Sequence, residues 1–306
     1  MLIIDLRRDI LNINKIKLIQ NKLICFSIIL FISNVYGNSL TSYAESIDEK
    51  SGLWDIENIA LIIEDKELPS NSGGKEIALC VFDNKHSKVK LLSISRDTYV
   101  ESPNGEATKI GVLSDTASKR YIIDTINNNF NLKVSEYAKI DLIKLINTVV
   151  SIQCVTVDIR EEEVYYMKSY GIVSSATHNL TPSQALAFTR ISGVEVGGRE
   201  RSDRIRIVLA KCFEVIKKQP RENYLSLIYQ LIPCIESNIC SSSMVKIGMN
   251  VLSNATYNLG EQRIPFDNSR KKQRLGENTY WTYDKKYTKQ ALHDYIYNDI
   301  LPGCSN

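Results

Sequence analysis

The 306-residue sequence has few of the residues that mark specialised classes of protein. It contains 14 glycines and 7 prolines, too few for a collagen-like or low-complexity chain. Its 7 cysteines are too few for a disulfide-dense scaffold, and 3 histidines without a C-x-x-C pair argue against a zinc site. A mean hydropathy of −0.16 excludes a protein that crosses a membrane many times. The composition is that of an ordinary globular protein of one or two domains.

A large excess of one charge is also lacking. The chain has 38 Lys and Arg against 35 Asp and Glu, a net charge of +3, which gives no general attraction to nucleic acid. The positive charge is local instead. Between residues 186 and 221, nine basic residues stand against four acidic ones.

The first 45 residues differ from the rest of the chain. Five basic residues, at positions 7, 8, 15, 17 and 22, precede an apolar run over residues 23–32. This order is typical of an export signal or a single N-terminal anchor. The run is shorter than the ~20 residues of a full span, so two alternatives stay open: an anchor extended by residues 35–37, or a signal cleaved near Ala44. In both, the body lies on the extracellular side, anchored to the cell membrane or secreted. A buried core helix is the third interpretation.

Apolar spacing predicts strands over residues 59–63, 78–82, 89–94 and 155–159. It predicts helices over residues 118–130, 140–150, 202–218, 241–253 and 289–300. Thr181-Pro182-Ser183-Gln184 has the sequence of a helix start with a capping box. Strands that alternate with helices indicate an α/β domain with a mixed sheet. We divide the chain into a signal or anchor (1–45), a linker (46–57) and one domain (58–303).

Two arginines occupy unusual positions on the predicted helix 202–218. Its apolar stripe is formed by residues 205, 208, 209, 212 and 216, and Arg201 and Arg204 each lie four residues before a member of this stripe. Both are therefore expected on the buried side of the helix, whereas Arg206 is expected on the solvent side. A phosphate suits guanidinium groups at a helix N-terminus. The alternative is that both arginines pair with carboxylates such as Asp203, Glu200 or Asp97.

Polar residues also lie where the predicted strands begin and end. Arg96 and Asp97 follow the strand 89–94, at the kind of position where α/β sheets bind ligands, although an Arg-Asp step is also compatible with a plain surface ion pair. Asp65 ends its strand and Glu76 begins the next. Neighbouring strands would bring these two carboxylates together as oxygen ligands for Mg²⁺.

Together these segments resemble the LytR-CpsA-Psr family of cell-envelope phosphotransferases. KLLSISRDTYV at residues 90–100 closely matches the family's LLSIPRDTYV, and VTVDI at 155–159 resembles its GGVTVDVP. LTPSQALAFTR at 180–190 resembles LtGeQALAYvR, and RSDR at 201–204 falls on the RxxR of DFGRxxRQ. Lys109 begins a match to KIN in which Gly111 replaces Asn, while Asp65 and Glu76 fall on the aspartates of GtDsR and SDTi. The order of the motifs makes the resemblance specific.

The resemblance implies an α/β/α sandwich with a hydrophobic tunnel for lipid. It implies an enzyme that moves a glycopolymer from a polyprenyl-pyrophosphate carrier onto peptidoglycan. The catalytic residues implied by position are Arg96, Asp97, Arg190 and Arg201. The arginines would grip the pyrophosphate, and Asp97 would orient an arginine or help activate the acceptor hydroxyl. Substrate-binding residues would be Lys109, Arg204 and Arg199, and Asp65 and Glu76 would hold Mg²⁺, which stabilises charge as the phosphoanhydride breaks.

The chain departs from the family motifs at four positions: Glu67, Ser192, Gly198 and Ile205. Glu67 and Ser192 replace arginines, and Arg199 is a candidate to fill the vacancy at Ser192. These departures motivate an alternative function, a protein that binds the lipid-linked glycan without transferring it. A DNA-binding regulator, suggested by the basic helix alone, is disfavoured by the export signal and the buried-side arginines, so no nucleic-acid partner is expected.

Overall fold

The computed structural model describes residues 56–69, 74–192, 196, 198–254 and 256–303. The predicted signal or anchor, and the predicted linker up to residue 55, lie outside these residues, so the boundaries at residues 45 and 57 stay predictions. Within the described ranges, every helix is too short or too polar to cross a bilayer.

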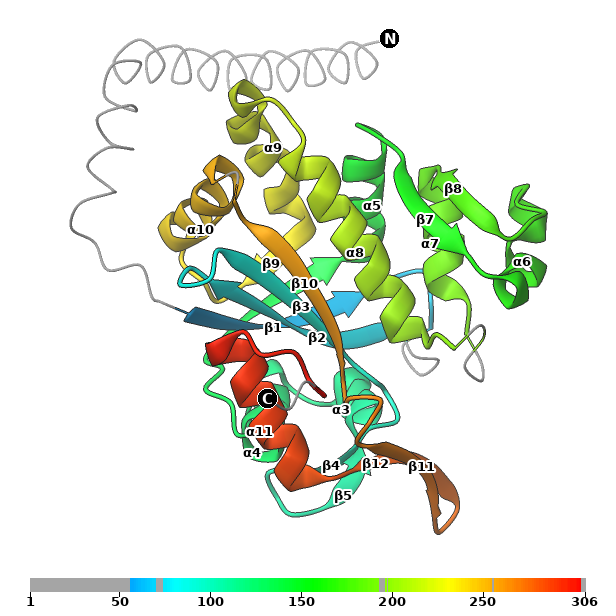
Figure 1. Cartoon of the computed structure of the whole chain (residues 1–306), viewed down its shortest axis with the longest axis vertical. Helices are drawn as coiled ribbons and strands as arrows, with labels where there is room; N and C mark the ends of the chain where they lie inside the picture. The colour runs from blue at the N-terminus through cyan, green and yellow to red at the C-terminus, as the bar shows by residue number, and fades with distance from the viewer. Residues whose placement is uncertain (1–55, 70–73, 193–195, 197, 255, 304–306) are drawn as a thin grey trace, which may run out of the picture. The chain divides into compact units, whose positions relative to one another are not determined.

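A six-stranded mixed sheet forms the centre of the described fold (Figure 1). Two of its strand pairs are parallel, β10 with β3 and β1 with β6, and the other three are antiparallel. The predicted mixed sheet is therefore confirmed. In spatial order the strands are β10 (Asn258–Ile264), β3 (Lys88–Ile94), β2 (Lys75–Asp83), β1 (Ile56–Glu64), β6 (Glu136–Asp141) and β9 (Ile235–Ser237).

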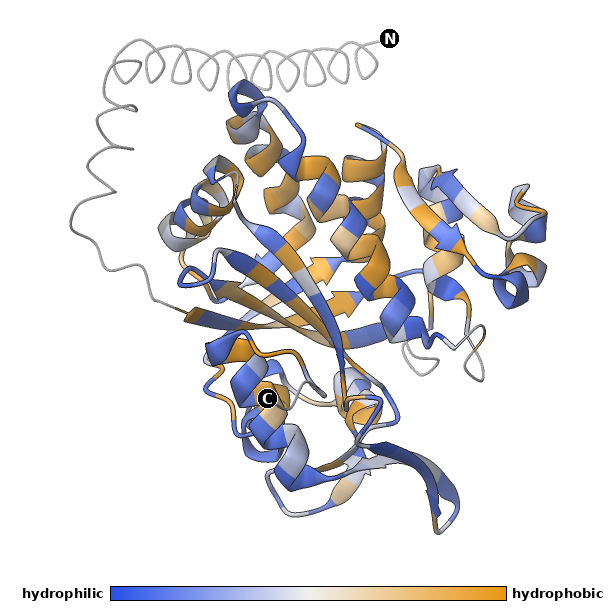
Figure 2. Cartoon of the chain, in the orientation of Figure 1, coloured by the Kyte–Doolittle hydropathy of each residue, from blue (hydrophilic) through white to orange (hydrophobic). Residues whose placement is uncertain are grey.

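Helices cover both faces of this sheet. Because side chains alternate along a strand, residues 59, 61 and 63 of β1 pack on one face, and residues 60 and 62 pack on the other. One face is covered by α5 (Leu142–Val150), α7 (Pro182–Arg190) and α8 (Arg201–Lys217). The other is covered by α3 (Ile110–Thr116), α4 (Lys119–Phe130) and α11 (Lys285–Asn298). The predicted α/β/α sandwich is confirmed, and Figure 2 shows the hydrophobic residues gathered along the sheet and the inner sides of the helices.

Several elements lie outside the main sheet and the helices named above. Three two-stranded ribbons are separate from the main sheet, and they pair β4 with β5, β7 with β8, and β11 with β12. Their strands are β4 (Tyr99–Glu101), β5 (Ala107–Lys109), β7 (Val155–Ile159), β8 (Ala176–Leu180), β11 (Arg270–Leu275) and β12 (Asn278–Tyr283). The remaining helices of the described residues are α6 (Glu161–Met167), α9 (Tyr224–Leu231), α10 (Ser241–Ser253) and the short 3₁₀ turns η1 (Lys168–Tyr170), η2 (Arg221–Asn223) and η3 (Ile232–Cys234). Helices α6, α9 and α10 extend the layer of α5, α7 and α8, because Met167, Leu231 and Met244 pack on the same core.

The predicted helix over residues 140–150 was placed two residues too early. Residues 136–141 form strand β6, and the helix α5 begins only at Leu142. Asp141 ends the strand and caps the helix, because its carboxylate accepts a hydrogen bond from the Lys144 backbone N–H at 3.1 Å. The apolar pattern runs continuously through this junction, so spacing alone does not locate it.

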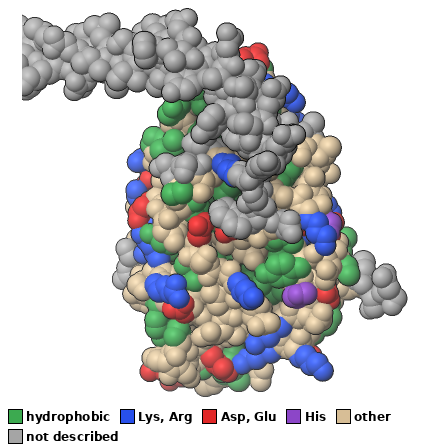
Figure 3. Space-filling view, turned by 90° about the vertical axis from the view of Figure 1, so that its left-hand side faces the viewer, with side chains coloured by type: hydrophobic (Ala, Val, Ile, Leu, Met, Phe, Trp, Pro, Cys, Tyr) green, Lys and Arg blue, Asp and Glu red, His purple; other side chains and the backbone are tan. Residues whose placement is uncertain are grey.

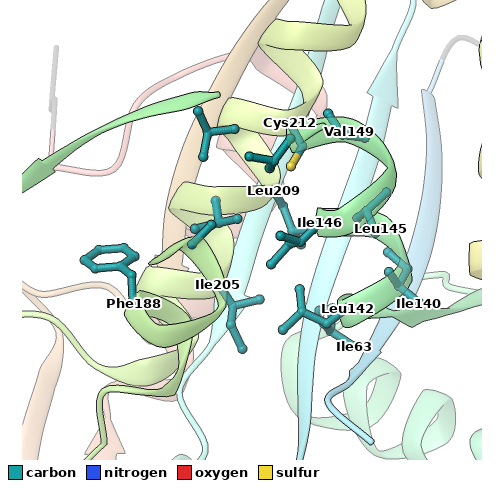
Figure 4. Close-up of a cluster of buried hydrophobic side chains, with 14 of the residues drawn as sticks. Ile63, Ile140, Leu142, Leu145, Ile146, Val149, Phe188, Ile205, Leu209 and Cys212 are labelled. Carbon is teal, nitrogen blue, oxygen red and sulfur yellow. The ribbon is translucent and has the colours of Figure 1, made fainter. Parts of the chain in front are cut away.

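A wide apolar layer lies between the sheet and helices α5, α7 and α8. Figure 4 shows side chains from α5 and α8, among them Ile146 and Leu209, converging on the space between these two helices. Strands β1 and β6 contribute Ile63 and Ile140, and α7 contributes Phe188. We call these buried side chains, together with Ile205 of α8, the apolar layer.

Candidate functional site

Four strands of the sheet bring polar residues to one edge. Strand β1 ends just before Asp65, and β2 begins next to it, because the Asp65 backbone N–H donates to the carbonyl of Gly74 at 2.8 Å. Strand β3 ends just before Ser95, whose backbone N–H donates to the carbonyl of Ile264 at 2.9 Å, where β10 ends. The C-terminus of α7 and the N-terminus of α8 reach the same edge through the ion pairs described below.

Arg190, the last residue of α7, binds the carboxylate that follows β1. The predicted capping box of α7 is present, with reciprocal hydrogen bonds between Thr181 and Gln184. At the other end, Arg190 Nε and Nη2 donate to the two oxygens of buried Asp65 at 2.7 and 2.9 Å. Arg190 Nη2 also donates to Glu67 at 2.7 Å. The hydrogen bond that Arg190 donates to Asp65 raises the pKa of the guanidinium, although burial opposes it, so Arg190 carries a fixed positive charge at this edge.

Arg201, the first residue of α8, binds the carboxylate that begins β2. Its Nη1 donates to Glu76 Oε1 at 2.9 Å, and its Nε donates to the carbonyl of Thr189 at 3.2 Å. Glu76 is buried, and burial raises its pKa to about 7 in spite of the nearby charges of Arg201 and Arg96. Its second oxygen, Oε2, is buried without a hydrogen-bond partner among the described residues. Buried polar atoms in folded proteins usually have a hydrogen-bond partner or bind a metal ion.

The two predicted magnesium ligands lie on the same face of neighbouring strands. Ile63 pairs with Glu76 in the register of β1 and β2, and Asp65 lies two residues beyond Ile63. The structure's described part holds no group of three or more His, Cys, Asp or Glu side chains arranged for a metal. Mg²⁺, however, is commonly held by one or two carboxylates, with water and substrate phosphates completing its shell. The unpartnered Oε2 of Glu76 and the adjacent Asp65 carboxylate fit such an ion.

Arg96 lies at the same edge and is held by helix α3. Its Nη2 donates to Asp115 at 2.8 Å and to the carbonyl of Gly111 at 3.2 Å, and its Nη1 donates to the carbonyl of Lys75. A Cβ atom at position 111 would lie 2.8 Å from Arg96 Cβ and 2.9 Å from the Arg96 carbonyl oxygen. A side chain at position 111 would therefore require a shift of Arg96 or of the start of α3.

Asp97 and Lys109 form a pair beside Arg96. Lys109 Nζ lies 2.8 Å from Asp97 Oδ1, and Asp97 is 48% exposed. The backbone N–H of Trp281, in the β11–β12 ribbon, donates to the Asp97 carbonyl at 2.8 Å. Asp97 therefore pairs with a lysine and not with an arginine, which was one of its two expected roles. The other role, activation of the acceptor hydroxyl, stays a prediction.

Arg204 and Arg199 share a buried carboxylate on α6, that of Glu163. Arg204 is on the buried side of α8 as predicted, with 1% of its side chain exposed. Its Nε donates to Glu163 Oε1 at 2.9 Å, and Arg199 Nη1 donates to Glu163 Oε2, also at 2.9 Å. Arg204 further donates to the carbonyls of Ile191 and Val196, at 3.3 and 2.6 Å. Both guanidinium groups are thus part of a buried ion-pair network, and the structure does not place them to contact a phosphate. Arg201 and Arg204 both pair with carboxylates, as the alternative expected, but with Glu76 and Glu163 and not with the three that it named.

Three further arginines surround the N-terminus of α8, and sequence reasoning missed their role. Arg206 Nη1 donates to Asp203 at 2.9 Å, Arg263 Nη2 lies 3.0 Å from the same carboxylate, and Arg270 Nη1 donates to Glu200 at 2.7 Å. The expectation that Arg206 faces solvent was wrong, since only 12% of its side chain is exposed. Helix α8 packs across β3 and β10, so the side of the helix that bears Arg206 is covered by the sheet. For Arg263 and Arg270, the feature of the sequence that could have indicated a role is their position, near the end of β10 and at the start of β11.

Comparison with known protein families identifies the family to which this chain belongs. A family model described as the LytR_cpsA_psr family matches residues 55–295. The chain belongs to the LytR-CpsA-Psr family. Members of this family are cell wall glycopolymer transferases. Among curated proteins, no sequence matches the chain.

Solved structures of LytR-CpsA-Psr proteins share this fold. A structure of TagT bound to LI-WTA has a TM-score of 0.63 and 16% identity, and the match covers 82% of this chain and 94% of that one. The LytR-CPS2A-psr family protein YwtF (TagT) with bound octaprenyl pyrophosphate lipid has a TM-score of 0.59 and 15% identity, covering 81% and 94%. Protein gbs0355 from Streptococcus agalactiae has a TM-score of 0.62 and 18% identity, covering 80% and 88%. At these identities the likeness establishes the fold.

The four departures from the LytR-CpsA-Psr motifs have distinct structural settings. Glu67 binds Arg190, and Ser192 is exposed just beyond α7. Gly198 has a φ of +69°, a conformation that an aspartate would adopt only with strain. Ile205 is buried in the apolar layer.

Proposed function

We propose that this chain is an extracytoplasmic phosphotransferase that moves a glycopolymer from a polyprenyl-pyrophosphate carrier onto peptidoglycan. The observation that carries the proposal is that the apolar layer and the charged residues of the candidate site meet at one edge of the sheet. Ile63 and Phe188 of the apolar layer lie two residues before Asp65 and Arg190, respectively. Ile205 of the same layer lies four residues, about one helical turn, after Arg201. An apolar interior that ends in fixed cations suits a ligand with a hydrocarbon tail and a pyrophosphate head, and TagT, of the same fold, has been solved with octaprenyl pyrophosphate.

In this proposal the polyprenyl chain enters the apolar layer through a tunnel, and the pyrophosphate lies at the edge of the sheet. Arg190, Arg201 and Arg96 would neutralise its charge, aided by Lys109. The acceptor hydroxyl of peptidoglycan attacks the phosphorus bonded to the sugar, the phosphoanhydride bond breaks, and polyprenyl monophosphate leaves. Asp97, which is half exposed and paired with Lys109, would accept the hydroxyl proton. Developing negative charge on the leaving phosphate is stabilised by the arginines.

A magnesium ion would be held by Asp65 and Glu76 and would supply additional positive charge to the pyrophosphate. Its binding requires the ionised form of Glu76, whose pKa is about 7 without a metal. The ion would also compete with Arg190 for Asp65, since both oxygens of that carboxylate accept hydrogen bonds from Arg190. Arg190 would then turn its donors to the phosphate.

The second candidate function is binding of the lipid-linked glycan without transfer. The contact that favours it is the 2.7 Å hydrogen bond from Arg190 to Glu67, an acidic residue in place of a family arginine. Glu67 would reduce the positive charge available to a phosphate. Because 63% of the Glu67 side chain is exposed, its effect on Arg190 is moderated by solvent.

The two functions are distinguished by turnover of a polyprenyl-pyrophosphate-linked sugar by the full chain in detergent. Release of polyprenyl monophosphate would be measured with peptidoglycan, in Mg²⁺ and in EDTA. Arg201→Ala is the test variant, and Arg120→Ala, at an exposed position on α4, is the matched control. Transfer lost only in Arg201→Ala supports the transferase, and binding without release supports the second candidate. Full activity of Arg201→Ala would contradict the proposed site.

The proposed location is the cell membrane, with the domain outside and attachment through residues 1–45. It rests on the charge and hydropathy order of that segment. Protection of an N-terminal tag from external protease, with cleavage of the domain in intact cells, tests it.

A further inference from the structure

Helix α9 and the turn η3 that follows it expose a row of apolar side chains that the candidate site does not use. Leu225, Tyr229 and Ile232 are 47%, 66% and 44% exposed. Their spacing of four and then three residues places them on one side of the helix, and we call them the α9 stripe. Figure 1 shows α9 beyond the C-terminus of α8, and Figure 2 shows hydrophobic residues along it. In the lower half of Figure 3, by contrast, charged side chains of both signs are interspersed on the surface.

The opposite side of α9 is packed on the domain. Tyr224 and Leu227 are buried against Leu252 of α10, and Leu231 packs on the core formed by α5, α7 and α8. A helix that is apolar on all sides is normally buried, whereas α9 is apolar on both its packed and its exposed side. Exposed apolar patches of this kind mark contacts with proteins, ligands or membranes.

Helix α9 begins at the end of the sheet where the chain enters the domain. Ile56, the first residue of β1, pairs with Asp83 at the end of β2. Asn84 accepts a hydrogen bond from Asn250 of α10 at 2.9 Å, and Leu252 of the same helix packs against the first turn of α9. The candidate site lies at the other end of β1, and the nine residues of this strand separate the two ends by about 30 Å.

Two features of the sequence around this end favour a membrane as the partner of the stripe. In the proposed location, residues 1–45 attach the protein, and residues 46–55 join them to β1. A segment of ten residues reaches at most about 36 Å, which keeps this end of the domain near the bilayer. Basic residues also border the stripe. Between residues 215 and 235 three basic residues stand against one acidic residue, and Lys218 and Arg221 are exposed.

We propose that the α9 stripe lies in the interface of the membrane to which the chain is attached, so that this end of the domain faces the bilayer and the candidate site faces away from it. Tyrosine is enriched at membrane interfaces, where lysine and arginine contact anionic headgroups. The leucine and isoleucine of the stripe would reach the acyl boundary. A second copy of the chain fits less well, because a stable interface buries about 800 Å² on each partner and the stripe offers only three side chains. The proposal rests on the proposed location and not on the transfer reaction.

The test uses the full chain reconstituted in vesicles of phosphatidylcholine and phosphatidylglycerol, with and without phospholipid brominated in the upper half of its acyl chains. Bromine quenches the fluorescence of an indole that it contacts. Tyr229→Trp places an indole on the stripe, and the control Tyr165→Trp places one on α6, where the tyrosine is 82% exposed. The wild type, with its two native tryptophans, gives the background.

We expect brominated lipid to quench the new indole of Tyr229→Trp about twofold or more, since an interfacial side chain is buried about 5–10 Å into the acyl boundary. The new indole of Tyr165→Trp should be quenched no more than the background. Equal quenching of the two indoles would overturn the proposal, as would the absence of quenching at position 229. A blue shift at position 229 that grows with the protein-to-lipid ratio, without quenching, would overturn it in favour of a second copy of the chain.

A pair of serine variants tests whether the neighbouring side chains hold the contact. Adding Leu225→Ser and Ile232→Ser to Tyr229→Trp should remove most of the quenching. Adding Val173→Ser and Leu301→Ser, at exposed apolar positions elsewhere, should leave it unchanged, and the same loss in both would overturn the role of the stripe. Turnover is measured separately, so the two proposals fail independently. Quenching without transfer would leave the membrane contact and remove the proposed function, and transfer without quenching would do the reverse.

Discussion

The buried network around Glu163 gives a sharp prediction about stability. Glu163 is fully buried on α6 and accepts hydrogen bonds from Arg199, from Arg204 and from the backbone of Arg160. The substitution Glu163→Gln keeps the size of the side chain and removes its charge. Two guanidinium groups that are 11% and 1% exposed then lose their shared counterion. Removing one partner of a buried pair costs about 3–5 kcal/mol, because the remaining charge is left uncompensated.

The assay is equilibrium unfolding in urea, followed by circular dichroism, on the full chain in detergent. We expect the free energy of unfolding to fall by about 3–5 kcal/mol in Glu163→Gln. The matched control is Glu67→Gln, which breaks an ion pair of Arg190 that is largely exposed to solvent and costs under about 1 kcal/mol. A second variant, Arg204→Met with Glu163→Gln, should lose less than the sum of the single losses, since the two residues contact each other. Equal losses in Glu163→Gln and Glu67→Gln would refute the assignment of Arg199 and Arg204 to a structural network.

Three further predictions concern the edge of the sheet. Gly111→Ala places a Cβ 2.8 Å from Arg96 and should lower transfer up to about a hundredfold by displacing that arginine. In the control Gly248→Ala the new Cβ would meet its nearest atom at 3.7 Å, so transfer should be unchanged. Equal effects of the two substitutions would contradict the role of Gly111. Folding raises the pKa of Glu76 from 4.5 to about 7, so protonated Glu76 favours the folded state. This contribution to stability is complete below about pH 4.5 and is lost as pH rises to 7. Urea titrations in EDTA should show this loss in the wild type and a flatter profile in Glu76→Gln, and identical profiles would contradict the shift. Mg²⁺ with inorganic pyrophosphate, at a hundred times Kd, should raise the Tm of the wild-type protein by about 5–10 °C. The substitution Asp65→Asn should abolish this rise, and the same rise in Asp65→Asn would exclude Asp65 as a ligand.

The layers of the fold follow from the sequence because local patterns specify them. Residues 59–63 are apolar at every position, as expected for a strand buried on both faces, and they lie in β1. Residues 89–94 are apolar at four of six positions and lie in β3, where Lys90 and Ser93 are buried as well. The capping box at Thr181 located the start of α7 to the residue. Strand β6 was missed because its residues, EYAKID, mix charged and apolar side chains and lead without a break into α5.

The candidate site is only partly readable from the sequence, because its pairs join distant segments. The spacing on α8 placed Arg204 on the buried side of the helix, but its partner Glu163 lies 41 residues away and has no local signal. The pairs of Arg190 with Asp65 and of Arg201 with Glu76 each span 125 residues. The motifs indicated each of these four residues separately. Only the register of β1 and β2, with the end of α7 and the start of α8, shows which residues form pairs.

The most direct test of the account is release of polyprenyl monophosphate from a polyprenyl-pyrophosphate-linked sugar by the full chain, with Arg201→Ala and Arg120→Ala beside it. The account predicts release that requires Mg²⁺ and a peptidoglycan acceptor, is retained in Arg120→Ala, and falls about a hundredfold or more in Arg201→Ala, by analogy with the loss of one oxyanion donor. Release by Arg201→Ala at the wild-type rate would show that the arginines at the edge of the sheet do not stabilise the breaking phosphoanhydride.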